Sequence, residues 1–164
     1  MDNTSTCISS PKELFGFSLG DQKDKYEKRP FLSTPRGIAL DEDAGIIYVC
    51  EMVEKSIHVF TMDGSHITTF GNTFFDLPWG ILLYDGYLFV TDVGRSSLIM
   101  LRDCRMDEVN RETTHFKFCR GMSISSKTEE LFIADEGRNR VVVCTIEPLC
   151  FKRVFARGVI NPLM

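Results

Sequence analysis

Short runs of apolar residues recur along the chain, and each run stops at a glycine or at a cluster of charged residues. The runs are rich in β-branched and aromatic residues, which favour strands. Helical periodicity of 3.6 residues is weak throughout the chain. The pattern predicts strands at 37–40, 46–50, 56–61, 66–70, 80–83, 87–91, 97–102, 113–118, 121–125, 130–134, 140–146 and 151–155.

These strands repeat as a group with a period of about 42 residues. Three glycines are spaced 43 and 41 residues apart, and the acidic residues that follow them are spaced 41 and 43 apart. The glycines are Gly37, Gly80 and Gly121, and the acids are Glu51, Asp92 and Asp135. Four strands per period of this length are typical of a β-propeller blade. The sequence therefore predicts an all-β fold, a β-propeller of four-stranded blades with three repeats in an incomplete ring.

The repeat boundaries divide the chain. Residues 1–12 are expected to be a disordered N-terminus, and residues 13–164 a partial propeller. Within it we expect the outer strand of a preceding blade at 13–20, blades at 35–71, 78–118 and 119–158, and the start of a truncated repeat at 159–164.

The repeated acid has a structural interpretation. It lies where the second strand of each repeat ends, so its carboxylate can accept hydrogen bonds from backbone donors in the connection. The residue that opens the third strand is a second candidate donor. That residue is Ser56, Ser97 or Arg140 in the three repeats.

The repeats resemble the NHL repeat. Each has a Pro-x-Gly-like start, then a strand ending in an acid, then a polar loop and a hydrophobic strand, and the third unit, with ADEGRNRVVVC, fits best. The second unit departs in its fourth strand, where CRMDEVNRETTHFKF replaces a short turn. The resemblance implies a scaffold for protein–protein interaction. If it extends to tripartite-motif NHL proteins, a longer parent could be a ubiquitin ligase through domains absent here, or a post-transcriptional regulator that binds RNA.

NHL propellers have about six blades, so the resemblance implies half a ring. Two explanations stay open: the chain is part of a longer protein, or two copies pair. The surplus strand at 13–20 and the incomplete repeat at 159–164 favour the first. Open flanks leave blade faces uncovered and predict aggregation or pairing. The apolar residues expected on these flanks are Ile38, Val49, Phe89, Leu131 and Val142.

Composition is that of an ordinary globular protein, with 164 residues, 43% apolar content and a net charge of -4. No segment has the length of a membrane span or the pattern of a signal peptide. The six cysteines form no CxxC pair. We therefore expect a cytoplasmic setting with buried or idle thiols, and no membrane partner.

Residues for catalysis are sparse. Of the three histidines, His58 and His66 fall in outer strands of the repeat alignment, far from a central channel, and no GxSxG or phosphate-binding loop is present. We expect no catalytic residue, no metal and no cofactor in this chain. The alternative is half of a metal-dependent propeller enzyme, lactonase- or lyase-like, whose ligands would lie outside this half.

One set of residues indicates binding. The residue before each repeat glycine is Arg36, Trp79 or Arg120, which places all three at the start of an innermost strand. The loops after the acids add Glu54, Arg95 and Arg138 to the same face. Arginine and tryptophan are favoured anchors for peptides, and they can also hold RNA phosphates and stack a base. The alternative is that these residues form no binding site: Trp79 packs against its own loop, and the arginines are solvated or paired with neighbouring acids.

Protein or peptide is the preferred partner, and RNA is possible. The reason is the acidic first blade, whose charges would repel phosphates. The residues concerned are Asp41, Glu42, Asp43 and Glu54.

Overall fold

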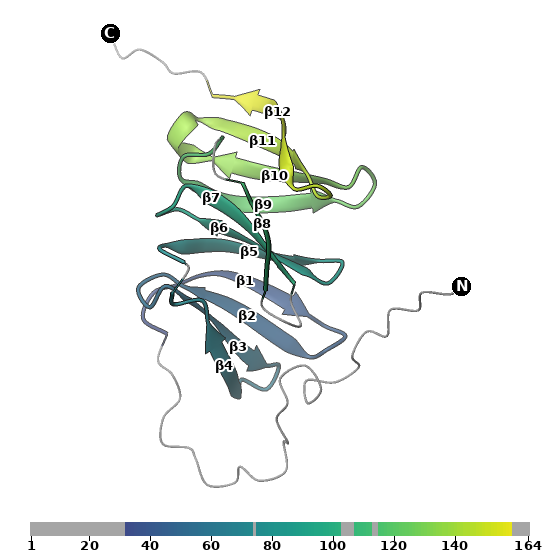
Figure 1. Ribbon diagram of the computed structural model, residues 1–164. Helices are drawn as coiled ribbons and strands as arrows, with labels where there is room; N and C mark the ends of the chain where they lie inside the picture. The colour runs from purple at the N-terminus through teal and green to yellow at the C-terminus, as the bar shows by residue number, and fades with distance from the viewer. Residues whose placement is uncertain (1–31, 74, 103–106, 113–114, 159–164) are drawn as a thin grey trace, which may run out of the picture.

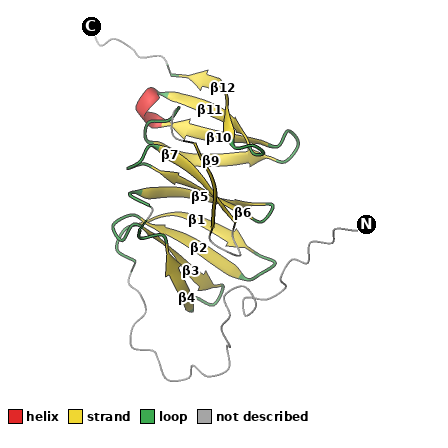
Figure 2. Cartoon of the chain, viewed as in Figure 1, coloured by secondary structure: helices red, strands yellow, loops and turns green. Residues whose placement is uncertain are grey.

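The computed structural model describes residues 32–73, 75–102, 107–112 and 115–158 (Figure 1). The features expected at 1–12, 13–20 and 159–164 lie outside these residues. Apart from one short 3-10 helix, the described residues form strands and loops (Figure 2). The predicted all-β fold is confirmed.

The strands form three antiparallel sheets of four, each running through its strands in chain order, and we call these sheets blades 1 to 3. Blade 1 contains β1 (Pro35–Asp41), β2 (Ile46–Glu51), β3 (Ser56–Thr61) and β4 (His66–Phe70). Blade 2 contains β5 (Pro78–Tyr84), β6 (Tyr87–Asp92), β7 (Ser97–Arg102) and β8 (Asp107–Glu112). Blade 3 contains β9 (Cys119–Ser125), β10 (Glu130–Asp135), β11 (Arg140–Thr145) and β12 (Cys150–Arg157), with the 3-10 helix Glu136–Arg138 between β10 and β11.

One predicted strand was wrong. The outer strand of blade 2 is β8, which pairs with β7, and not 113–118. Of that segment, residues 115–118 form the loop that enters β9. Phe116 in this loop is buried in the core between blades 2 and 3. The apolar residues of this loop were therefore taken for a strand. The actual outer strand was missed because its sequence, DEVNRE, is mostly charged.

Two apolar cores join the blades in chain order. The first lies between blades 1 and 2, and the second lies between blades 2 and 3. Four of the five residues expected on open flanks are buried, and three of them belong to the second core. The buried four are Val49, Phe89, Leu131 and Val142, whereas Ile38 is exposed as expected.

The first strands of neighbouring blades, β1, β5 and β9, lie side by side (Figure 1). Their backbones approach closely at the repeat glycines. A Cβ atom on Gly37 would lie 2.6 Å from the Trp79 carbonyl oxygen, and one on Gly80 would overlap the carbonyl oxygen of Arg120. These positions need glycine because a neighbouring backbone occupies the space of a side chain.

No disulfide joins the described cysteines, and no helix among the described residues is long and apolar enough to span a membrane. Burial raises the pKa of the Cys50 and Cys119 thiols above their usual range. Cys7 and Cys104 lie outside the described residues.

Candidate binding face

The antiparallel connections place certain loops at one end of every blade. The start of each first strand lies at the same end as the turn between the second and third strands. The glycine contacts align these ends, because the start of β1 meets the start of β5, and the start of β5 meets that of β9. We call this end the candidate face.

Arg36, Trp79 and Arg120 meet on the candidate face. The guanidinium carbon of Arg36 lies 4.3 Å from the centroid of the Trp79 ring, and that of Arg120 lies 4.2 Å from it. Both distances fall within the range of cation–π interaction. Three residues that are about 42 positions apart in sequence thus form one cluster, with one residue from each blade.

A cavity of about 450 Å³ surrounds this cluster. Besides the cluster, its walls are the repeat glycines and the apolar residues that follow them. These further lining residues include Gly37, Ile38, Gly80, Ile81, Gly121 and Met122. The volume is that of a small ligand site or of a few peptide side chains.

The two arginines differ in their partners. Arg120 forms an ion pair with Glu136 from the 3-10 helix of its own blade. Arg36 is exposed, and no described carboxylate pairs with it. An anionic group entering the cavity would therefore find, at Arg36, a positive charge that no carboxylate of the described residues neutralises.

The loop residues Glu54, Arg95 and Arg138 lie on the candidate face but outside the cluster. The carboxylate of Glu54 contacts Nε2 of the buried His58 at 2.9 Å. Arg138 donates to the carbonyl oxygen of His115 in the neighbouring loop, and the side chain of Arg95 is exposed. The sequence analysis did not predict the pairing of Glu54 with His58. Glu54 lies in the turn before β3 and His58 lies on β3, four residues later, and this spacing was the available signal.

The repeat acids anchor the loops that enter the first strands. Asp92 accepts hydrogen bonds from the backbone N–H groups of Asp76 and Leu77, at 2.8 and 2.9 Å. Glu51 accepts from Thr34, and Asp135 accepts from Lys117. All three carboxylates are buried, and the loops they hold lead directly to Arg36, Trp79 and Arg120.

The third-strand residues behave differently from one another. Arg140 Nε donates to Asp135 at 2.8 Å. Ser56 Oγ is buried and has no hydrogen-bond partner among the described residues, so the expected bond to Glu51 is not formed. The serine hydroxyl is short, and the Glu51 oxygens are occupied by the backbone of Thr34 and Val53.

Charges separate between the two ends of the blades. Among the side chains that are not buried, the described part of the candidate face carries more bases than acids: Arg36, Lys55, Arg95, Lys117, Arg120 and Arg138 against Glu54, Asp76 and Glu136. The buried carboxylates of Glu51, Asp92 and Asp135 lie at the same end. The described turns at the opposite end carry mostly acids: Glu42, Asp43, Asp63, Asp85, Glu129 and Glu147 against Lys127. An anionic ligand is therefore favoured at the candidate face.

This separation corrects one argument from sequence. Asp41, Glu42 and Asp43 lie at the far end of β1 from Arg36, because the strand runs the length of the blade between them. They do not line the candidate face. Glu54 does lie there, but it is paired with His58.

Among the described residues, no group of three or more His, Cys, Asp or Glu side chains is arranged so that it could hold a metal ion. The described histidines include a cluster in blade 1, where His58 contacts the rings of Phe60 and His66. Thr69 links the two imidazoles by hydrogen bonds.

Comparison with known proteins bears on the fold. No protein-family model and no curated protein matches the chain. Solved structures do match. A structure of a nidogen/laminin complex has a TM-score of 0.65 at 20% identity, over 76% of this chain and 48% of that chain.

Two further matches are hydrazine synthase of Kuenenia stuttgartiensis and glutaminyl cyclase of Myxococcus xanthus. Their TM-scores are 0.59 and 0.54, their identities are 22% and 13%, and they cover 74% and 69% of this chain. The shares of their own chains are 37% and 48%. The chain is a β-propeller of open form that spans less than half the length of each of these three chains.

Proposed function

We propose that the chain is a binding module of NHL-repeat type that holds an acidic segment of a partner protein on its candidate face. The observation that carries the proposal is the cluster of two guanidinium groups around the single tryptophan, inside a cavity. Arginine and tryptophan are the residue types enriched at the energetic centres of protein interfaces.

The chemistry of the cluster specifies the ligand. Arg36 offers charge-assisted hydrogen bonds to a carboxylate, and the half-buried Trp79 ring offers apolar area to an adjacent side chain. The excess of bases on the candidate face would steer an acidic segment toward it. A protein ligand agrees with a scaffold role for a propeller.

RNA is the second candidate, and the charge separation favours it. The acids of the first strand turn lie at the opposite end, so they would not repel phosphates at the candidate face. We place it second because the described basic residues surround one aromatic ring rather than several, and single-strand binding commonly uses successive stacking platforms.

The link to ubiquitin ligation rests on the resemblance alone and stays a prediction about a longer protein. The expectations that this chain is not an enzyme, and that it lies in the cytoplasm, also stay predictions.

The test is fluorescence anisotropy with the full chain and two labelled probes. One probe is a short glutamate-rich peptide with a central phenylalanine, and the other is an oligouridine of similar length. The variants are Trp79→Ala and Arg36→Gln, with Lys127→Gln as control, since it removes one exposed positive charge at the opposite end.

We expect the peptide to bind, and either variant to weaken binding roughly tenfold, the effect of losing about 1.4 kcal/mol. Lys127→Gln should leave binding unchanged. Tighter binding of oligouridine, with the steep salt dependence of many phosphate contacts, would favour RNA instead. Binding of neither probe, or equal loss in all three variants, would overturn the proposal.

A further inference from the structure

Blades 1 and 3 each have one face that no described blade covers. We call the face of blade 1 that points away from blade 2 the leading flank. We call the face of blade 3 that points away from blade 2 the trailing flank. The contacts between blades inside the chain show what each flank lacks.

The leading flank exposes residues whose equivalents in blade 2 are buried or partly buried. In blade 2, Ile81 follows the repeat glycine, is 8% exposed, and packs in the core against blade 1. Its equivalent in blade 1, Ile38, is 61% exposed. Leu40 is 49% exposed, whereas its equivalent Leu83 packs against the same core. The leading flank thus has the side chains of a blade contact without the blade.

The trailing flank is the other half of the same contact. A Cβ on Gly37 or Gly80 would strike the backbone of the next blade, but one on Gly121 would meet nothing within 4 Å. Tyr48 and Phe89 are fully buried against the next blade, and their equivalent in blade 3, Phe132, is partly exposed. The space beside Gly121 and Phe132 therefore has the form of a receiving site for a first strand.

We propose that the leading flank of one copy docks on the trailing flank of a second copy, head to tail, and that two such contacts close a ring. Inside one chain, Ile81 of blade 2 and Tyr48 of blade 1 belong to the same core. In each contact between copies, Ile38 of one copy would pack in the same way against Phe132 of the other. The backbone at Arg36 would approach Gly121 as the backbone at Trp79 approaches Gly37. Such a contact is heterologous, and it gives a closed pair when the rotation closes.

The extent of the fold is compatible with a ring of two copies. The chain spans 48% of the matched chain in the nidogen/laminin structure, 48% of glutaminyl cyclase and 37% of hydrazine synthase. Two copies together would span most of each of these three chains.

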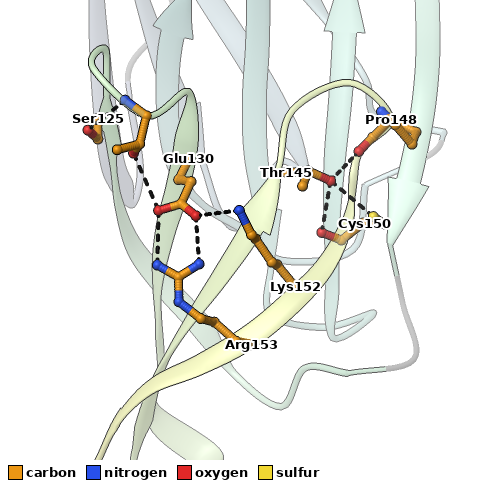
Figure 3. Close-up of polar contacts among 8 residues, drawn as sticks. Ser125, Glu130, Thr145, Pro148, Cys150, Lys152 and Arg153 are labelled. Carbon is orange, nitrogen blue, oxygen red and sulfur yellow. Dashed lines mark hydrogen bonds and ion pairs between the residues drawn. The ribbon is translucent and has the colours of Figure 1, made fainter.

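The charges on the trailing flank are compatible with docking. Glu130 lies two residues before Phe132 on β10, so the two side chains share a face. Figure 3 shows that Glu130 is already paired with Lys152 and Arg153, at 2.7 Å and at 2.6 and 2.9 Å. An apolar strand that docks beside this cluster would not leave a lone carboxylate without a partner.

Closure would also change the candidate face. Each copy contributes one cluster of Arg36, Trp79 and Arg120 along its first strands, so the pair would place two clusters around one channel. The inference is nonetheless independent of the ligand, because it rests on the flanks and not on the cluster.

The test is the molar mass of the full chain by light scattering after size exclusion, over a range of concentrations. Gly121→Val places a side chain in the receiving site, and its Cβ would meet no atom within 4 Å in one copy. Ile38→Glu places a charge on the opposite flank. Val53→Glu is the matched control, because Val53 is equally exposed but lies in a loop off the flank.

We expect the chain to have twice the 18.7 kDa of one copy. Gly121→Val and Ile38→Glu should each give a folded monomer with an unchanged circular dichroism spectrum, and Val53→Glu should remain a dimer. A chain that is monomeric at all concentrations would overturn the proposal. So would oligomers larger than two, or a dimer that persists in both flank variants.

Discussion

Thr91 Oγ1 donates a hydrogen bond to the carbonyl oxygen of Arg120 at 2.9 Å, which ties blade 2 to the backbone of blade 3 beside the Trp79 ring. The same Oγ1 accepts from the N–H group of Gly80 at 2.8 Å. These two hydrogen bonds can form only because Gly80 has no side chain, since a Cβ atom there would overlap the Arg120 carbonyl oxygen. The distance between the tryptophan and the second arginine is therefore set by a backbone contact between blades.

Substituting Gly80 by alanine should destabilise the chain. The new Cβ would overlap the Arg120 carbonyl oxygen, which belongs to the backbone and cannot rotate away. We expect a loss of about 1–3 kcal/mol, the usual cost of overpacking, from urea unfolding followed by circular dichroism.

Gly121→Ala, in dilute solution, is the matched control for this substitution. Its Cβ meets no atom within 4 Å in the same chain, so the free energy of unfolding should change little. Equal losses in the two variants would show that the effect comes from glycine itself and not from the contact with the next blade.

A second prediction concerns the repeat acid of blade 2. The Asp92 carboxylate accepts from the backbone N–H groups of Asp76, Leu77 and Arg95. Asp92→Asn replaces one acceptor oxygen with an NH₂ group that faces a donor. Because hydrogen bonds to a buried charge are among the stronger ones, we expect a loss of about 1.5–3 kcal/mol in the free energy of unfolding.

Asp85→Asn makes the same chemical change in an exposed turn, at a positive φ that asparagine tolerates. It should leave stability nearly unchanged. If Asp92→Asn were equally mild, the carboxylate would not be what holds the loop before Trp79.

Much of the fold could be predicted from the sequence, because blade cores need a regular apolar pattern. The period of the glycines and acids located three blades, and the glycine is required wherever a neighbouring first strand approaches. The outer strand β8 could not be located, since an outermost strand buries little apolar surface and so carries a weak pattern.

The site was harder to predict. Equal register placed Arg36, Trp79 and Arg120 at the same end, but contact between them depends on how closely the blades pack. The charges were misplaced for another reason. The charge was counted for the first blade as a whole, but successive turns of one blade lie at opposite ends. The acids near Glu42 were therefore counted against a phosphate ligand although they lie far from the candidate face.

Trp79 allows a third prediction, because it is the only tryptophan and its fluorescence reports on the cluster alone. When each quenching constant is divided by that for free N-acetyltryptophanamide, iodide should exceed caesium by on the order of twofold, since two guanidinium groups raise the local concentration of anions. Arg36→Gln should reduce the difference, and added salt should reduce it further. Equal quenching by both ions would contradict a positive potential at the ring.

The ion cluster of Glu130 gives a prediction about pH. Hydrogen bonds from Arg153 and Lys152 lower the pKa of the Glu130 carboxyl from 4.5 to about 2. A carboxyl with a lowered pKa in the folded state contributes stability above its ordinary pKa, and this contribution is lost as pH falls toward the folded value. The free energy of unfolding of the wild type should therefore exceed that of Glu130→Gln most at neutral pH. The difference should shrink between about pH 4.5 and pH 2.

The matched control is Glu129→Gln, one residue earlier in an exposed turn with no described ion pair. Urea unfolding at a series of pH values measures both variants against the wild type. The control should show only a small difference from the wild type near neutral pH. If Glu130→Gln matched the wild type at every pH, the side chain would act by packing, because glutamine keeps the shape of glutamate but not its charge. A difference that stays constant down to pH 2 would contradict the lowered pKa of the Glu130 carboxyl.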